Sequence, residues 1–207
     1  MPIIKVQKIN KQTHWGLWFI SETEDELQNL VEDEIDSSII NPNKKKEWLA
    51  GRALLKELVY QSGGEYKGTT KDEYGKPFLI NHSQQISLSH SYPYVAALID
   101  ETKPVGIDLE QPKSKLLNIA SRVLSQEELI DAGDDVVKHC VYWCAKEAMY
   151  KLYGKRGLHF SSELLVNNFI LENAGNLQGR IIAGSKQLSV GLTYFIQPDY
   201  VVVLTQT

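Results

Sequence analysis

Several features that this chain lacks narrow its class. It has only two cysteines in 207 residues, too few for a disulfide framework. No apolar run approaches the roughly 20 residues of a membrane-spanning helix, so we expect no membrane association. The net charge of −4 gives no field that attracts nucleic acid, and we expect none as a partner. Any anion that this protein binds must therefore meet a local group of basic residues.

Common targeting and catalytic signatures are missing as well. The start, Met1-Pro2-Ile3-Ile4-Lys5, does not have the charged and then apolar layout of a signal peptide, so we expect a cytoplasmic protein. The chain contains no P-loop and no dinucleotide fingerprint. Neither Ser89 nor Ser91 lies in the G-x-S-x-G frame of a serine hydrolase.

The two cysteines, Cys140 and Cys144, are four residues apart on one predicted helix. That spacing separates their Cβ atoms by roughly 5–6 Å, too far for a disulfide. With His139 they could suggest a metal site, but a zinc site rarely takes three ligands from one helical turn. Reduced, partly buried thiols are the better interpretation.

Hydrophobic patterning predicts an α+β chain. In the first half, the strands are expected at 3–9, 14–20, 78–80, 86–89 and 94–99, with a long helix at 43–61. In the second half, the expected strands are 105–110, 169–171, 178–182, 188–195 and 200–204. The helices there are expected at 115–124, after the capping box 125–128, and at 134–153. Each half has one long helix and several strands, which is compatible with two similar lobes, 1–103 and 104–207.

Two carboxylates interrupt the apolar strand at 105–110. Asp108 and Glu110 are two residues apart, so their side chains project from the same face of the strand. Two like charges side by side repel each other, and a hard cation between them would relieve the repulsion. The alternative is an edge strand with a solvated face, where carboxylates are ordinary.

A third carboxylate, Glu147, lies between Lys146 and Lys151 on the long helix of the second half. Trp143, Glu147 and Lys151 follow one stripe of that helix. An exposed Glu147–Lys151 ion pair is the ordinary interpretation of this stretch when it is taken alone. Three carboxylates with lysines nearby would suit Mg²⁺ and a substrate that carries phosphate.

Basic and hydroxyl residues of the first half form candidate phosphate contacts. Lys45, Arg52 and Lys56 share one face of the helix at 43–61, a pattern that is usually a solvated surface but that can hold an anion. Lys76 is held between Gly75 and Pro77 in a turn. The segment Ser87-Leu88-Ser89-His90-Ser91 offers several hydrogen-bond donors within five residues.

Five of these segments, in this order, resemble the 4′-phosphopantetheinyl transferase superfamily, and most closely its two-lobed, Sfp-like class. Together they lie within about residues 43 to 157, and the order and spacing make the resemblance specific although each segment alone is weak. The segments are Ala50-Gly51-Arg52-Ala53-Leu54-Leu55, Tyr74-Gly75-Lys76-Pro77, Ser87-Leu88-Ser89-His90-Ser91, Val105-Gly106-Ile107-Asp108-Leu109-Glu110 and Trp143-Cys144-Ala145-Lys146-Glu147-Ala148-Met149-Tyr150-Lys151.

The resemblance implies a pseudo-twofold, two-lobed α+β fold, each lobe a small sheet packed on a long helix, with coenzyme A and Mg²⁺ between the lobes. It implies that Asp108, Glu110 and Glu147 hold Mg²⁺, with Mn²⁺ as an alternative. Coenzyme A would be bound by residues of both lobes: Arg52, Lys76, Pro77, Ser89, His90, Lys146 and Lys151. The segment Pro112 to Leu124 would meet the carrier protein through Leu116, Leu117, Ile119 and Val123. Further basic residues that the family places before the first long helix have no counterpart at 32–40.

By this resemblance, the expected reaction moves the 4′-phosphopantetheine arm of coenzyme A onto a serine of an acyl or peptidyl carrier protein and releases adenosine 3′,5′-bisphosphate. Glu147 would be the general base, directly or through a water bound to the cation, and Lys151 would assist the leaving group. Asp108 completes the expected catalytic set, and we expect a monomer. The alternatives are a Mg²⁺-dependent nucleotide phosphohydrolase and a non-catalytic relative that binds coenzyme A or a carrier.

Overall fold

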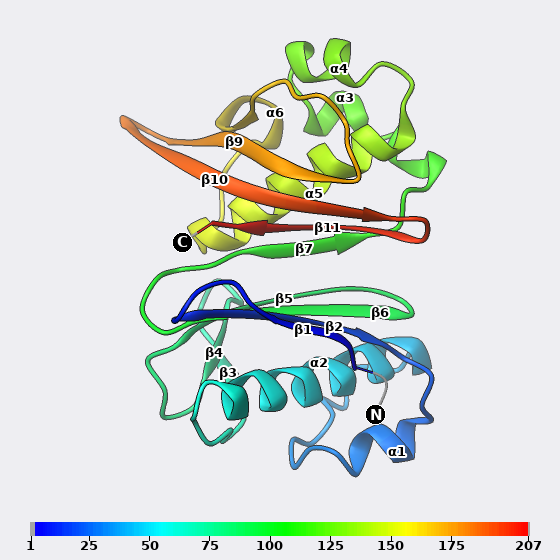
Figure 1. Cartoon of the computed structure of the whole chain (residues 1–207), viewed down its shortest axis with the longest axis vertical. Coiled ribbons are helices and arrows are strands. Elements are labelled where there is room, and N and C mark those ends of the chain that lie inside the picture. Colours follow the sequence, from blue (N-terminus) through cyan, green and yellow to red (C-terminus); the bar gives the residue numbers. More distant parts are fainter. Residues whose placement is uncertain (1–2, 207) are drawn as a thin grey trace. The chain divides into compact units, whose positions relative to one another are not determined.

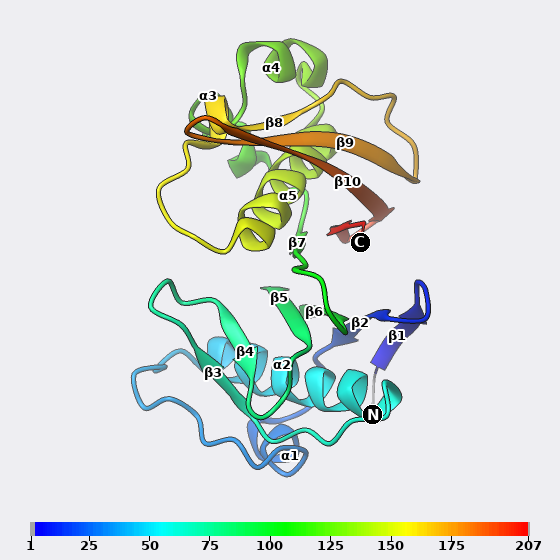
Figure 2. The ribbon, with the colours of Figure 1, turned by 90° about the vertical axis from the view of Figure 1, so that its left-hand side faces the viewer.

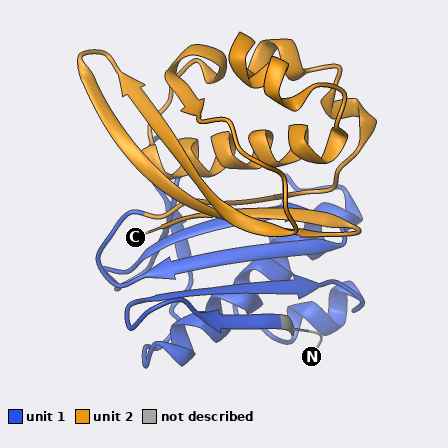
Figure 3. Cartoon of the chain, turned by 45° about the horizontal axis from the view of Figure 1, so that its top comes forward, with its two compact units in different colours: residues 1–104 blue, residues 105–207 orange. Residues whose placement is uncertain are grey.

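The structure is a computed structural model that describes residues 3–206. Met1, Pro2 and Thr207 lie outside the described residues. The first two belong to the start of the chain, where the sequence predicts no signal peptide. The chain divides into two compact units, residues 1–104 and 105–207 (Figure 3). Each unit has its own hydrophobic core. No helix of the described residues combines the length and the apolar character needed to cross a bilayer.

Unit 1 is an antiparallel sheet with one long helix on its face. The strands follow the order β1-β2-β6-β5, and a separate β3–β4 pair lies beside them (Figures 1 and 2). Apolar residues of helix α2, such as Leu54 and Leu58, are buried with Val95 and Ile99 of β6. The elements are β1 (Ile3–Lys8), β2 (Thr13–Phe19), α1 (Glu24–Gln28), α2 (Pro42–Gln61), β3 (Thr69–Lys71), β4 (Pro77–Leu79), β5 (Gln85–Ser91) and β6 (Tyr94–Asp100).

Local chemistry sets the ends of α2. The Asn41 side chain accepts hydrogen bonds from the backbone N–H groups of Asn43 and Lys44, and Pro42 fills the first helical position. Beyond the C-terminal end, Gly63 has a φ of 84°, a conformation that glycine adopts without strain. The first half of the chain therefore contains the strong helix that its pattern predicts.

Unit 2 also consists of an antiparallel sheet and a long helix. The strands follow the order β7-β11-β10-β9-β8, and the helix is α5. Asp135 caps the start of α5, and Gly154 ends it with a φ of 68°. The elements are β7 (Ile107–Glu110), the 3₁₀ turn η1 (Ser114–Leu116), α3 (Ala120–Val123), α4 (Gln126–Ala132), α5 (Val136–Tyr153), α6 (Phe160–Glu163), β8 (Leu164–Val166), β9 (Ala174–Ala183), β10 (Lys186–Gln197) and β11 (Tyr200–Thr205).

The predicted α+β class is confirmed, because each unit is a small antiparallel sheet with a long helix. The pseudo-twofold relation stays a prediction. Several local predictions are wrong. The strand expected at 169–171 is a loop, and the eighth strand is Leu164–Val166 instead. The helix expected at 115–124 is broken into η1 and α3. The chain also pairs Thr69–Lys71 as β3, a strand that the pattern did not predict.

Candidate functional site

A close approach of strand β7 to helix α5 organises the acidic site of unit 2. Gly106 lies just before β7, and a Cβ atom at this position would overlap the carbonyl of Ala148. Only glycine allows the two backbones to come so near. The approach brings Asp108, two residues further on, next to the final turns of α5.

Asp108 and Lys151 form the central ion pair of this site. The Lys151 ammonium donates to Oδ1 of Asp108 at 2.7 Å and to the backbone carbonyl of Ile107 at 2.9 Å. Asp108 is buried, whereas 28% of the Lys151 side chain is exposed. An ammonium has three N–H donors, so Lys151 keeps one for a ligand.

Glu147 stands beside this pair without a direct partner. It makes no hydrogen bond or ion pair with any residue that the structure describes. Burial raises the pKa of Glu147 to about 7, with a further contribution from the negative charge of Asp108, and Lys151 opposes the shift. A carboxyl group with a pKa near neutrality can take up and release a proton under physiological conditions.

The three predicted metal ligands are not brought together, which corrects the expectation of a converging triad. Glu110 accepts a hydrogen bond from the backbone N–H of Gln111, and its other oxygen lies 3.8 Å from the Lys115 ammonium. Among residues 3–206, no three aspartate, glutamate, histidine or cysteine side chains are grouped closely enough to hold a metal. Asp108 and Glu147 do fit a cation, because their charges interact unfavourably and the oxygens of both are hard ligands.

Lys146 contradicts its predicted role. It was expected to bind coenzyme A, but its side chain is fully buried and forms an ion pair with Glu128 at 2.6 Å. Its remaining donors bind the carbonyls of Val123 and Phe160. Because Glu128 and these two carbonyls hold the ammonium, Lys146 does not face the acidic site. Adjacent positions on a helix diverge by about 100°, which separates Lys146 from Glu147.

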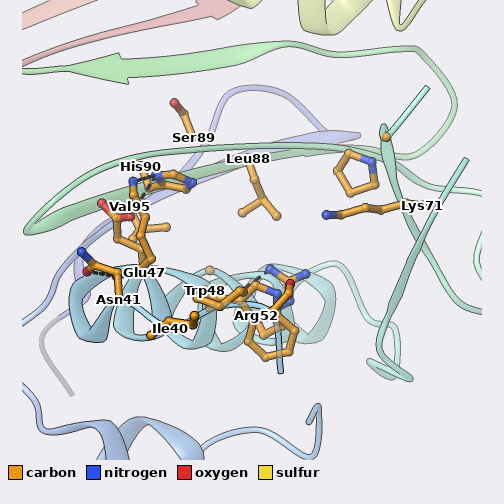
Figure 4. A pocket seen from close by; sticks show the side chains of 16 residues that line it. Ile40, Asn41, Glu47, Trp48, Arg52, Lys71, Leu88, Ser89, His90 and Val95 are labelled. Atoms are coloured by element: carbon orange, nitrogen blue, oxygen red, sulfur yellow. Dashed lines mark hydrogen bonds and ion pairs between the residues drawn. The ribbon is translucent and has the colours of Figure 1, made fainter. Parts of the chain in front are cut away.

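Unit 1 contains a pocket of about 600 Å³ beside the N-terminal half of α2 (Figure 4). Apolar side chains such as Trp48, Leu88 and Val95 form part of its wall, and basic side chains lie around them. An apolar wall with a few charged groups suits a ligand that has both a flat ring and an anionic group. The lining residues are Ser38, Ile39, Ile40, Asn41, Lys44, Glu47, Trp48, Gly51, Arg52, Lys71, Gly75, Pro77, Leu88, Ser89, His90 and Val95.

Arg52 is the strongest anion-binding candidate in this pocket. Its guanidinium stacks on the Trp48 ring at 3.9 Å from the centroid, which fixes the plane of the fork. The contacts to the Trp48 carbonyl and to Oγ1 of Thr69 are long, 3.5 Å each, and the buried Nε atom has no partner among the described residues. Burial lowers the pKa of Arg52. A bound anion would supply the negative charge and the hydrogen-bond acceptor that the buried guanidinium lacks beside it.

A second charged group lies at the other end of the pocket. The buried carboxylate of Glu47 approaches the Lys44 ammonium at 2.7 Å and the His90 ring at 3.2 Å. It also accepts a hydrogen bond from the backbone N–H of Tyr92 at 2.8 Å. Glu47 therefore holds two cationic or donor side chains from different elements at one place.

The other predicted residues of unit 1 differ in their placement. Pro77 lines the pocket, but Lys76 does not, and its pKa is lowered by burial. Ser89 belongs to the wall, yet its side chain leaves β5 on the opposite face from Leu88 and His90 (Figure 4). Alternation along the strand requires this, because successive side chains point to opposite faces.

Sequence reasoning missed Lys71, which lines the pocket from β3. Lys71 is opposite Pro77 in the β3–β4 pair. The β-branched residues Thr69 and Thr70 were the available signal for that strand. Once the strand and the turn at Asp72–Gly75 are combined into a hairpin, the lysine necessarily lies beside the proline.

Comparisons with known proteins show the family to which this chain belongs. A model of the 4′-phosphopantetheinyl transferase superfamily matches residues 104–205, the part that carries Asp108, Glu147 and Lys151. The 4′-phosphopantetheinyl transferase HetI of Nostoc sp. is 30% identical over 160 residues, which cover 67% of this chain and 68% of HetI. This chain belongs to the 4′-phosphopantetheinyl transferase superfamily. The 4′-phosphopantetheinyl transferase Sfp of Bacillus subtilis is also 30% identical, over 145 residues that cover 60% of this chain and 64% of Sfp.

Membership of the 4′-phosphopantetheinyl transferase superfamily places the protein among enzymes. Such transferases move phosphopantetheine from coenzyme A to carrier proteins. The chain spans about two thirds of the length of these relatives. The predicted resemblance is therefore confirmed at the level of the family, and the match of the family model includes the acidic site.

Proposed function

We propose that this protein transfers the 4′-phosphopantetheine arm of coenzyme A to a serine of an acyl or peptidyl carrier protein and releases adenosine 3′,5′-bisphosphate. The observation that carries the proposal is the group formed by Asp108, Lys151 and Glu147. It combines an ion pair that has a spare donor with a carboxylate that has no hydrogen-bond or ion-pair partner among residues 3–206. These residues lie in the region that matches the family.

The pocket of unit 1 is proposed to bind the nucleotide end of coenzyme A. Arg52 and Lys71 offer charge to the 3′-phosphate, with His90 and Lys44 at the other end of the pocket. Pro77 and the apolar wall suit the adenine ring. Lys76 and Ser89 remain proposed contacts, but their side chains would have to reach the ligand from outside the pocket or from the far face of β5.

Glu147 is the proposed general base. The carrier serine must lose its proton as its oxygen attacks the phosphorus of the pantetheine-side phosphate, and Glu147 can accept that proton. The P–O bond to the nucleotide-side phosphate breaks in the same displacement. Lys151 directs its remaining N–H at the leaving phosphate oxygen and stabilises the charge that develops there.

A divalent cation, Mg²⁺ or Mn²⁺, fits the charges at Asp108 and Glu147. Glu110 shares a face of β7 with Asp108, but it is not grouped with Asp108 and Glu147 and is therefore not part of the proposed cation site. When bound, such an ion supplies charge neutralisation and orientation of a pyrophosphate. In the structure, Lys151 supplies a positive charge beside Asp108.

The segment from Pro112 to Leu124, here called the carrier-facing segment, is the proposed contact for the carrier. Among its four predicted apolar contacts, Leu117 is 37% exposed and Ile119 and Val123 are partly buried. Leu116 is buried in the core of unit 2 and cannot contribute. The alternation follows from the 3₁₀ turn, which directs one leucine inward and the next outward.

Intact-mass spectrometry of apo-carriers tests the proposal. Acyl and peptidyl carrier proteins are incubated with coenzyme A, Mg²⁺ and the enzyme, and the expected result is a mass increase of one phosphopantetheine group together with release of adenosine 3′,5′-bisphosphate. Release of nucleotide without any carrier would instead indicate a phosphohydrolase. Binding of coenzyme A with neither product would indicate a non-catalytic relative.

A further inference from the structure

Lys146 is a buried lysine that takes part in no step of the proposed reaction. It is among the largest fully buried side chains of the chain, and all three donors of its ammonium have partners. They contact Oε2 of Glu128 at 2.6 Å, the Phe160 carbonyl at 2.9 Å and the Val123 carbonyl at 3.0 Å. A saturated ammonium cannot bind a phosphate oxygen unless it gives up one of these contacts.

Both carboxylate oxygens of its partner Glu128 also accept hydrogen bonds. Oε2 of Glu128 also accepts the backbone N–H of Ser125 at 2.6 Å and completes the capping box that begins α4. Oε1 accepts the backbone N–H of Val166 in β8 at 2.8 Å. The charge of Glu128 is therefore matched by one cation and two backbone donors in a region with almost no solvent.

The pair joins separate segments of unit 2 at one point. Through Lys146 it connects α5 with the last residue of α3 and the first residue of α6. Through Glu128 it connects the same point with the start of α4 and the end of β8. Val123 also belongs to the carrier-facing segment, so the lysine next to the proposed base is bonded directly to that segment.

We propose that the Lys146–Glu128 pair is a positioning element that holds the carrier-facing segment in register with the helix that carries Glu147. This inference rests on the proposed function for the identity of the docking partner, but not for the anchoring itself. A buried ion pair loses much of its attraction to desolvation, so stability alone is a weak reason for it. Directed bonds to two carbonyls and two N–H groups do provide a fixed geometry that apolar packing would not provide.

The test compares Lys146→Met with Lys155→Met, in which the exposed lysine just beyond α5 is changed in the same way. Hydrogen exchange of the backbone amides is measured on the full chain without ligands. In Lys146→Met, amides of residues 112–124 and 160–166 are expected to exchange about tenfold faster or more, because local opening becomes easier. Lys155→Met is expected to exchange as the wild type does.

Kinetics then separate positioning from substrate contact. Lys146→Met is expected to raise the KM for the carrier by about fivefold or more, while the dissociation constant for coenzyme A, measured by calorimetry without carrier, stays within about twofold of the wild-type value. A loss of coenzyme A affinity of about tenfold, with unchanged hydrogen exchange of the backbone amides, would overturn the proposal. It would indicate that Lys146 contacts coenzyme A.

A double variant, Lys146→Met with Glu128→Gln, keeps the test decisive if the single variant does not fold. It leaves no uncompensated buried carboxylate, so the melting temperature is expected to recover relative to Lys146→Met. Exchange at 112–124 is expected to stay fast, because the Val123 and Phe160 carbonyls still lack the ammonium. Full recovery of protection would show that the pair only balances charge and would refute positioning.

The outcome for the proposed function is separate. If the wild type transfers nothing to any carrier, the proposed function fails, and the hydrogen-exchange data still decide whether the pair anchors the segment.

Discussion

At the scale of single residues, what distinguishes the charged groups of this protein is how each one is neutralised. Lys146 has a partner for every donor and acts inside the fold. Lys151 has two partners and keeps one donor, and Glu147 has no hydrogen-bond or ion-pair partner in the part of the chain that the structure describes. Because a reacting group must be able to change its partners during the reaction, the incompletely satisfied side chains are the chemical candidates.

The first prediction concerns the proposed base. Glu147→Gln keeps the shape of the side chain but removes the proton acceptor, so transfer is expected to slow by about 100-fold or more. The rate is measured from carrier masses under saturating coenzyme A. Glu127→Gln, at an exposed position of α4, is the control and is expected to retain full activity. Wild-type turnover by folded Glu147→Gln would exclude the role.

The second prediction concerns Arg52. Arg52→Ala removes from the pocket a stacked guanidinium whose Nε has no partner among the described residues. The KM for coenzyme A is therefore expected to rise by about tenfold or more. Turnover at saturation is expected to change by less than about twofold. Lys56→Ala is the matched control, because Lys56 shares α2 but donates to the Leu30 carbonyl and does not line this pocket. A defect confined to turnover would contradict the anchoring role.

At the scale of elements, the acidic site depends on two backbones that nearly touch. The short strand β7 pairs with β11 on one side, and Gly106 before it meets α5 without an intervening side chain. The hydrogen bond from the Gly106 N–H to Oγ1 of Thr205, 3.0 Å long, holds this stretch in place. The placement of Asp108 beside Lys151 follows from this contact.

The third prediction tests the contact. Gly106→Ala places a methyl group against the Ala148 carbonyl, and either β7 or α5 must move. The free energy of unfolding is expected to fall by about 1–3 kcal/mol or more, as for overpacked cores. Chemical denaturation measures it. Gly51→Ala is the control, because its Cβ would meet Leu88 at 3.6 Å, an ordinary contact, and stability should be kept or raised. Equal stability of Gly106→Ala and wild type would refute the close packing.

At the scale of the whole molecule, the chain consists of two units of similar size, each with its own core. In the proposed function, the pocket of unit 1 binds the nucleotide end of coenzyme A, and the acidic site of unit 2 acts on the pyrophosphate. A ligand that binds only the folded chain stabilises it in proportion to the logarithm of its concentration over Kd. Thermal stability therefore reports binding independently of turnover.

The fourth prediction uses this linkage. Coenzyme A at about 100 times its Kd is expected to stabilise the wild type by about 2.7 kcal/mol, seen as a raised melting temperature. Glu147→Gln is expected to keep most of this shift, because the base is not the nucleotide anchor. Arg52→Ala at the same ligand concentration is expected to lose much of it. Equal shifts in wild type and Arg52→Ala would exclude the pocket of unit 1 as the nucleotide site.

Local periodicity was enough to predict the long helices, most of the strands and the α+β class. The helix at 43–61 and the helix ending at Gly154 follow from caps, glycines and apolar spacing within the segments themselves. The two-residue spacing of Asp108 and Glu110 likewise predicted a shared strand face. Motif order then identified the family, because that order is a property of the chain alone.

Only the tertiary structure decided which charged side chain faces a partner and which faces a site. Lys146 and Lys151 look equivalent along the chain, yet one is paired with Glu128 and the other with Asp108. Glu110 is drawn to Lys115 rather than into a triad, and the side chain of Ser89 leaves the sheet on the far face from the pocket. The physical reason is that neutralisation of a charge depends on residues tens of positions away, whereas helix and strand periods depend on near neighbours.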